Sequence, residues 1–386
     1  MASESESAVT QTPRAAITAW LGVLFLLVLV LMTVGGFVRL SESGLSLAGW
    51  PTVGGRILPP VTEAGWQDHF NMYVADLADL KERKAAGEIG IGIVPPTPAD
   101  VASFRQIYLT EFSHRALAAL VAIVGLGCLV SLLRRRELRR LAGGPLVGVL
   151  TLVVIQSVIG GILVLTGTST HWLFVHMGLA TGILGLVMWA LLLMLKGHRR
   201  PAPWELRCER RSALRWTWVA VLLVFAQIVL GALVAGSRQY GMSTTWPLMN
   251  GVWVPELWNA TKALAWNLID NAALHQWVHR WFAWLVVAGI LVAARQVAAS
   301  SAGPRARLAM RFAVSTVFVQ IALGLLNVFS NVDILIALTH LVVALMLFTG
   351  LVIQLFDLHH ESAGAEVATA ASDDAAGARV WASEAA

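Results

Sequence analysis

Residues 111–133 read EFSHRALAALVAIVGLGCLVSLL, a polar pentapeptide with His114 that runs directly into an apolar segment. A helix of about 20 apolar residues is long enough to cross a hydrocarbon layer roughly 30 Å thick. This stretch therefore predicts a transmembrane helix that carries a histidine near its first end.

Comparable apolar segments occur along the whole chain. Its 386 residues are 57% hydrophobic and 13% charged, and the mean hydropathy is +0.70, which is unusual for a soluble domain. Short alternating strands typical of an outer-membrane barrel are not evident, so helices are expected. The sequence predicts an all-α polytopic membrane protein with eight spans at approximately Ile17–Val38, Phe112–Leu133, Leu146–Leu165, Trp172–Leu195, Trp216–Ala235, Leu274–Val297, Phe312–Phe329 and Ile334–Phe356.

Repeated spacings indicate an internal duplication. The first and second histidines of each half are 62 and 61 residues apart, and they are His114 and His176, then His279 and His340. A Gln-x-x-x-Gly motif precedes the second histidine by 20 residues in both halves, at 156–160 and 320–324. We therefore expect two tandem four-helix bundles, related by a pseudo-twofold axis along the membrane normal.

The expected order of segments follows from this duplication. It comprises a disordered cytoplasmic tail (1–16), a first four-helix repeat (17–196) with a long periplasmic loop (39–111), a basic cytoplasmic linker (197–215), a second four-helix repeat (216–357) and a disordered cytoplasmic tail (358–386). Helical stretches are expected within the long loop at Asp68–Lys84 and Ala99–Leu109, where they could form a lid.

The positions of lysine and arginine predict the orientation. These residues gather after the second, fourth and sixth expected spans, in 134–140, 196–215 and 305–311. Cytoplasmic loops carry such an excess, so these loops and both termini should be cytoplasmic, in a cell inner membrane. The loops also account for the net charge of +5, so membrane lipid is the expected surrounding and no nucleic acid is expected as a partner.

The four histidines share one depth, near one end of their spans. Imidazoles from two facing helices can hold a heme iron from both sides, so one heme per half is predicted, with Arg115, Arg280 and Arg39 as candidate partners of the propionates. No C-x-x-C-H motif is present, so the heme would be held by coordination and packing. A histidine simply hydrogen-bonded in a helix interface is the alternative for each position.

A carboxylate distinguishes the halves one turn before the first histidine. Glu111 precedes His114, whereas Gln276 precedes His279. A partly desolvated glutamate could exchange a proton with a reacting group. The alternative is an ion pair with Arg115 at the i, i+4 spacing. The difference predicts a reaction site in the first half and a permanent cofactor site in the second.

Several motifs taken together resemble the heme A synthase family, in its proteobacterial and mitochondrial branch, over about Ile17–Phe356. They are Gly35-Gly36-x-x-Arg39-Leu40-x-x-Ser43-Gly44-Leu45-Ser46, Phe104-x-x-Ile107-Tyr108-x-x-Glu111-Phe112-x-His114-Arg115, Thr245-Trp246-Pro247-Leu248-Met249-x-Gly251 and Gln276-x-x-His279-Arg280. The resemblance implies an oxidoreductase that converts the C8 methyl group of heme O to a formyl group by successive hydroxylation, giving heme A for terminal oxidases.

The resemblance also implies site residues and partners. His279 and His340 would ligate the iron of a heme b cofactor, His114 and His176 would hold the iron of the substrate heme, and Glu111 would be the catalytic carboxylate. A heme O synthase, oxidase assembly proteins and an unidentified electron acceptor are the implied partners. The added oxygen could come from water or from dioxygen. The alternative function is a non-catalytic membrane cytochrome with two b hemes that transfers electrons.

Overall fold

The computed structural model describes residues 2–46, 58–86, 97–166, 169–196, 204–237, 242–256, 264, 268 and 271–360, with side chains from Arg14 onward. Over these ranges the chain is helical and forms no named strand, apart from an isolated bridge between Met249 and Val252. The prediction of an all-α fold is confirmed.

Eight described helices are long and apolar enough to cross a membrane, as the sequence predicted. They are α1 (Ala2–Leu40, with its span at Arg14–Leu40), α3 (Val101–Leu133), α4 (Arg136–Leu165), α5 (Thr170–Lys196), α7 (Arg211–Gly236), α9 (Ala272–Ala298), α10 (Pro304–Phe329) and α11 (Ile334–His359). Three shorter elements accompany them, namely the 3-10 helix η1 (Ser43–Leu45), α2 (Glu63–Ala85) and α6 (Trp204–Glu209).

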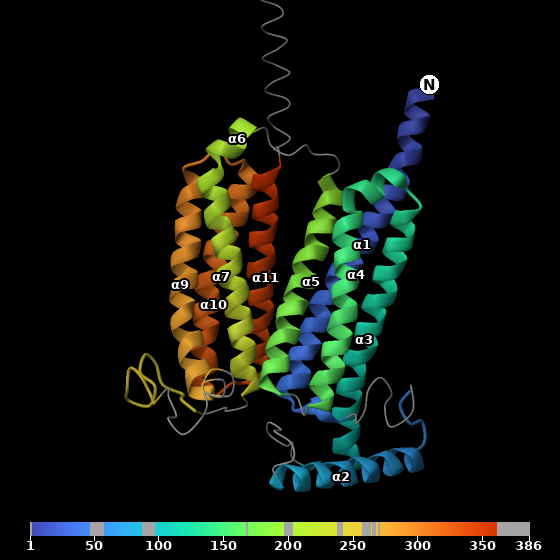
Figure 1. Cartoon of the computed structure of the whole chain (residues 1–386), viewed down its shortest axis with the longest axis vertical. Helices are drawn as coiled ribbons and strands as arrows, with labels where there is room; N and C mark the ends of the chain where they lie inside the picture. The colour runs from blue at the N-terminus through green and yellow to red at the C-terminus, as the bar shows by residue number, and fades with distance from the viewer. Residues whose placement is uncertain are drawn as a thin grey trace, which may run out of the picture.

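The spanning helices contact one another in the same order in each half of the chain. In the first half α1 packs on α3, α3 on α4, α4 on α5 and α5 on α1; in the second, α7, α9, α10 and α11 repeat this ring. The halves meet where α5 contacts α7 and α11, and where α1 contacts α11 (Figure 1). Within each ring the histidine-bearing helices, α3 and α5 or α9 and α11, lie across from each other. The pseudo-twofold symmetry between the halves stays a prediction.

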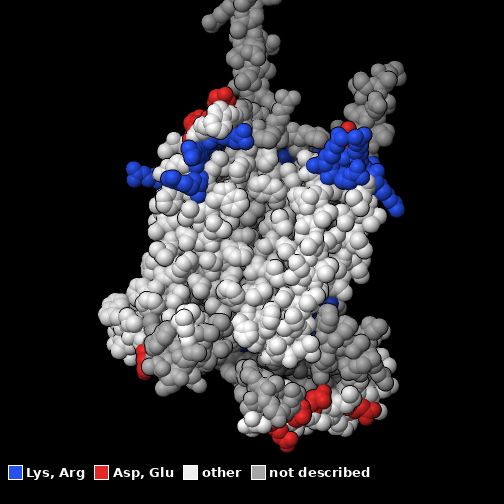
Figure 2. All heavy atoms as spheres, in the orientation of Figure 1, with Lys and Arg blue, Asp and Glu red and all other residues white. Residues whose placement is uncertain are grey.

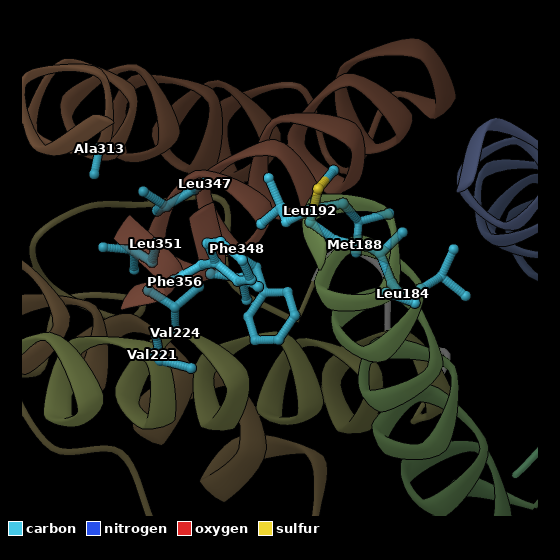
Figure 3. Packing of buried hydrophobic residues seen from close by; sticks show 14 of the residues in the cluster. Leu184, Met188, Leu192, Val221, Val224, Ala313, Leu347, Phe348, Leu351 and Phe356 are labelled. Carbon is cyan, nitrogen blue, oxygen red and sulfur yellow. The ribbon is translucent and has the colours of Figure 1, made fainter. Parts of the chain in front are cut away.

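Large apolar side chains fill the junction between the halves. Figure 3 shows Leu184, Met188 and Leu192 of α5 near Phe348 of α11, all within one continuous core cluster. In contrast, many leucines, isoleucines and valines on the outer helix faces are more than half exposed, among them Leu26, Ile123, Val154, Leu222 and Leu285. Such a belt of exposed apolar side chains suits a hydrocarbon surrounding.

Helix α3 is longer than its apolar run, which corrects the expected position of His114. The helix begins at Val101, where the Asp100 side chain accepts a hydrogen bond from the Ser103 backbone N–H and the pKa of Asp100 is lowered by that bond. His114 therefore lies more than three turns into the helix and does not open it. The expected loop 39–111 likewise gives way to α1 up to Leu40 and to α3 from Val101.

The added turns of α3 are supported by α2, which lies across the end of the first half (Figure 1). An aromatic cluster joins the two helices through Trp66, Tyr73 and Leu77 of α2 and Phe104 and Tyr108 of α3. The helical stretches expected at Asp68–Lys84 and Ala99–Leu109 are confirmed, and packing on α2 supports the turns that join the second stretch to the span.

Charge separates the two ends of the molecule, which we call the α2 end and the α6 end after the short helices beside them. Lysine and arginine gather at the α6 end and aspartate and glutamate at the α2 end (Figure 2). The first turns of α1 and the last turns of α11 both lie toward the α6 end (Figure 1). Residues 197–203 of the expected linker and 361–386 of the expected tail lie outside the described residues. Helix α1 is described from Ala2, within the segment expected to be disordered.

A buried ion pair joins the halves near the α6 end. Lys196, the last residue of α5, pairs with Asp357 of α11, and their side chains are only 3% and 8% exposed. Arg305 of α10 lies farther out, with its Nε 3.8 Å from the second carboxylate oxygen. Removing one member of a buried pair leaves the other charge uncompensated, which is more costly than losing the pair as a whole.

We therefore expect Lys196→Ala to lower the free energy of unfolding by about 3–5 kcal/mol. The double variant Lys196→Met/Asp357→Leu should recover most of that loss, because no isolated charge remains buried. Thermal unfolding of the purified protein in detergent would measure both effects. Glu63→Ala, which breaks the pair with Arg105 at a carboxylate side chain that is 83% exposed, serves as the control and should change stability little. Equal losses in the single and double variants would contradict this account.

Candidate functional site

Each of the four histidines faces a glycine on the neighbouring helix. A Cβ atom placed on that glycine would lie 3.0 to 3.4 Å from the nearest ring atom. The pairs are Gly35 of α1 with His114 of α3, Gly160 of α4 with His176 of α5, Gly231 of α7 with His279 of α9, and Gly324 of α10 with His340 of α11. A larger side chain would compete with the ring for the same space, so glycine is what lets each imidazole lie between two packed helices.

A glutamine anchors the backbone of three of these histidines. Its Nε2 donates to the histidine carbonyl oxygen at 2.9 to 3.0 Å, from Gln156 to His176, from Gln227 to His279 and from Gln320 to His340. In every case the glutamine lies four residues before the facing glycine. The fourth helix pair has Leu31 at the corresponding position.

Sequence reasoning found two of these glutamines and missed Gln227. The motif at 156–160 and 320–324 precedes its histidine by 20 residues, whereas Gln227 precedes His279 by 52. The intervening segment between α7 and α9 hides the relation. A search for Gln-x-x-x-Gly alone, without a fixed distance to the histidine, would have found 227–231.

His279 and His340 suit an iron atom held from two sides. Their ring centroids are 6.5 Å apart. An iron atom between two imidazoles makes a bond of about 2 Å to one nitrogen of each ring. When the distance from each nitrogen to its ring centre is added, the expected separation of the ring centroids is roughly the one observed. The Nδ1 atoms of both rings are buried without a hydrogen-bond partner, as is Nε of the adjacent Arg280. The two Nδ1 atoms lie on the edges of the rings that face Gly231 and Gly324, so the ring separation and the unpaired Nε of Arg280, which could bind a propionate, are the observations that fit a heme here.

The three arginines considered as propionate partners already bind protein groups. Arg280 donates to the carbonyl oxygens of Ser243 and Thr245, at 2.8 and 2.9 Å, and so holds the segment after α7. Arg39 of α1 donates to the carbonyls of Ala235 and Gly236 at the end of α7, and thereby links the halves. Cations commonly satisfy the last carbonyls of a helix in this way. Propionate binding by these residues stays a prediction.

Glu111 forms the ion pair that was the alternative to a catalytic role. It is 4% exposed, and its Oε1 accepts from Nε of Arg115 at 2.9 Å. In the second half the corresponding Gln276 has a buried Oε1 without a hydrogen-bond partner. The halves thus differ in chemistry as well as in sequence, since only the first has a carboxylate one turn before its histidine.

The remaining candidates take structural roles. A ring nitrogen of His275 lies 3.1 Å from the carbonyl oxygen of Leu268, so the i, i+4 pair with His279 is accounted for without a metal. Among the described residues, no group of three histidine, cysteine or acidic side chains could hold a metal ion. Cys128 is buried and Cys208 is exposed, and both are free thiols.

Fold and site together define a polytopic helical membrane protein with one pair of opposed histidines in each half of the chain. A family profile described as "cytochrome oxidase assembly protein" matches residues 18–352. The heme A synthase of Paracoccus denitrificans is 36% identical over 355 residues, covering 87% of this chain and 86% of the relative. That of Rhizorhabdus wittichii is 33% identical with 87% and 92% covered, and that of Sphingopyxis alaskensis is 33% identical with 95% and 98% covered. The chain belongs to the heme A synthase family of cytochrome oxidase assembly proteins.

The glycine contacts lead to a prediction for heme retention. Gly231→Val should push the His279 ring out of place, because the new Cβ would lie 3.2 Å from its Cε1 and the two methyl groups beyond it would need the same space. We expect the chain to retain about tenfold less heme at this position after purification, a change of about 1.4 kcal/mol in binding. The pyridine hemochrome spectrum per mole of chain measures this. Gly127→Val, at a glycine with open space around it, is the matched control and should retain heme normally.

Proposed function

We propose that this chain is a heme A synthase, an oxidoreductase that converts the C8 methyl group of heme O to a formyl group. The observation that carries the proposal is its similarity to heme A synthases along nearly the full length of both chains. Glu111 beside His114, in only one of two otherwise similar halves, supports an enzyme with one reaction site.

The second half would hold the cofactor. His279 and His340 would ligate heme b, and their separation of 6.5 Å and the unpaired Nε of Arg280 support this assignment. A heme ligated on both sides has no open coordination position, so when bound it would supply electron transfer. Gln227 and Gln320 would keep both histidine-bearing turns in place.

The first half would hold the substrate. His114 and His176 would orient heme O, and Glu111 would serve as the catalytic carboxylate. Oxidising a methyl group to a formyl group removes protons as well as electrons, and a desolvated carboxylate is suited to accept protons at the reacting carbon or from a water molecule. Arg115, bonded to Glu111 at 2.9 Å, would fix the direction of the carboxylate and stabilise its charge.

The alternative of a non-catalytic cytochrome with two b hemes is not favoured. The relatives named above, similar along nearly the full length of this chain, are heme A synthases.

We further propose how the protein is placed in the cell. It would lie in the inner membrane with both termini in the cytoplasm, with repeats 17–196 and 216–357 related by a pseudo-twofold axis. The gathering of basic side chains at the α6 end and the acidic α2 end support this orientation (Figure 2). A heme O synthase would deliver the substrate, oxidase assembly proteins would receive the product, and a separate acceptor would take the electrons.

The proposed reaction makes a prediction for Glu111→Gln. This change keeps the shape of the side chain and removes its ability to accept a proton, so conversion of heme O should fall about 10²- to 10⁴-fold. Heme b content should stay unchanged, and unconverted heme O should accumulate. Mass analysis of extracted hemes, from cells that also make heme O, measures all three quantities. Glu63→Gln, at an exposed carboxylate, is the control. Normal heme A in the Glu111 variant would refute the catalytic assignment.

The proposed orientation makes a second prediction. A green fluorescent protein fused after Ala386 should fluoresce, because that fusion partner matures in the cytoplasm. Alkaline phosphatase fused after Ala86, just beyond α2, should be active, because it requires the periplasm. Fusions of both reporters after Arg134, between α3 and α4, should behave like the C-terminus. The opposite pattern at these three positions would reverse the assignment.

A further inference from the structure

One of the four helix pairs departs from the pattern that the other three share. At the α4–α5, α7–α9 and α10–α11 pairs, a glutamine amide binds the carbonyl of the histidine on the facing helix. At the α1–α3 pair this position is Leu31, which packs against the apolar core. Among the described residues, no side chain donates a hydrogen bond to the His114 carbonyl. The turn of α3 that carries His114 is thus without the anchor that the other three turns have.

The His114 ring also lies differently. Its Nε2 and Cδ2 atoms face Gly35, at 3.0 and 3.4 Å from the position of a Cβ there. The other three histidines turn their Cε1 atom toward their glycine, at 3.2 to 3.4 Å. These three are also the ones whose Nδ1 is fully buried without a partner in the described structure. Both differences amount to a half-turn of the ring, which exchanges Cε1 with Nε2 and Nδ1 with Cδ2, so the missing glutamine is the feature that sets His114 apart.

The ion pair in the same turn does not replace the anchor. Glu111 and Arg115 both belong to α3, so their bond stiffens the turn without tying it to α1. A glutamine bond to a neighbouring helix, in contrast, restrains the rotation and shift of one helix against the other. In an apolar span no water competes for the carbonyl, so the presence or absence of that bond directly affects how firmly the histidine is held.

We propose that Leu31 makes His114 the exchangeable ligand of this protein, so that the first half can release its heme while the glutamine-anchored second half keeps its own. The inference rests on the proposed function in one respect, that the first half binds a substrate which must enter and leave. Leu31 is then a positioning residue that acts through His114. Restoring an amide at this position should make the first half resemble the second.

The test compares heme loss from the purified full-length chain bearing hemes in both halves. Leu31→Gln introduces the amide, and Leu31→Met is the matched control of similar size without a hydrogen-bond donor. Gln227→Leu removes the glutamine that binds the His279 carbonyl in the second half. Excess apomyoglobin captures released heme, and mass analysis of the heme left on the chain distinguishes heme b from heme O and its oxidation products. Binding of carbon monoxide to the reduced protein reports separately on whether a histidine ligand can be displaced.

In the wild type we expect the first-half heme to leave faster than heme b, and carbon monoxide to bind at one heme only. Leu31→Gln should slow the fast loss about 2- to 10-fold, the range expected for one net hydrogen bond, and should lower carbon monoxide binding to the same extent. Leu31→Met should leave both unchanged. Gln227→Leu should speed the loss of heme b by a similar factor; if that variant does not fold, Gln320→Leu tests the same point from α10.

Equal rates of loss for the two hemes in the wild type, or identical behaviour of Leu31→Gln and Leu31→Met, would overturn the inference. Neither result bears on whether heme O is converted, which is measured in the same preparations. If the two hemes leave at distinct rates but no oxidised product of heme O is found, the proposed reaction is refuted and the role of Leu31 still holds.

Discussion

The site depends on the close approach of two helices around an imidazole ring. At four places a histidine occupies the space that a glycine on the neighbouring helix leaves open, with no room for a further methyl group without movement. The backbone of the glycine-bearing helix therefore contacts one edge of the ring, and the other edges face the interior of the bundle. Because this occurs on opposite helices of each four-helix ring, each half presents two histidines toward one another near the same end.

Polar groups within the spans are satisfied mainly by the backbone. Glutamine amides bind histidine carbonyls, and Arg39 and Arg280 bind carbonyls at helix ends and in the segment after α7. In an apolar surrounding an unpaired polar group is costly, so these bonds also determine which helix turns stay in register. Among the buried groups without a hydrogen-bond partner is Nε of Arg280, next to His279.

The two halves share one framework and differ in a few residues that change its chemistry. Glu111 replaces the amide of Gln276, Leu31 replaces the anchor that Gln227 provides, and α2 covers the end of the first half alone. Under the proposed function, each difference would suit the first half to a reaction on an exchangeable heme and the second to a retained one. A duplicated bundle would thereby separate substrate and cofactor without a change of fold.

The sequence by itself determined the eight spans and singled out the four histidines, because hydropathy over about 20 residues and repeated spacings are local properties of the chain. Only the tertiary structure decided that the helical stretch expected at Ala99–Leu109 and the following span form one helix, that Gln227 belongs to the same pattern as Gln156 and Gln320, and that Arg39 binds the end of α7. These features arise from contacts between segments far apart in the chain. The packing of α2 on α3 stabilises helical turns in a polar stretch of the chain. The partner of a side chain such as Gln227 depends on which helix lies next to it, and a local sequence pattern does not contain that information.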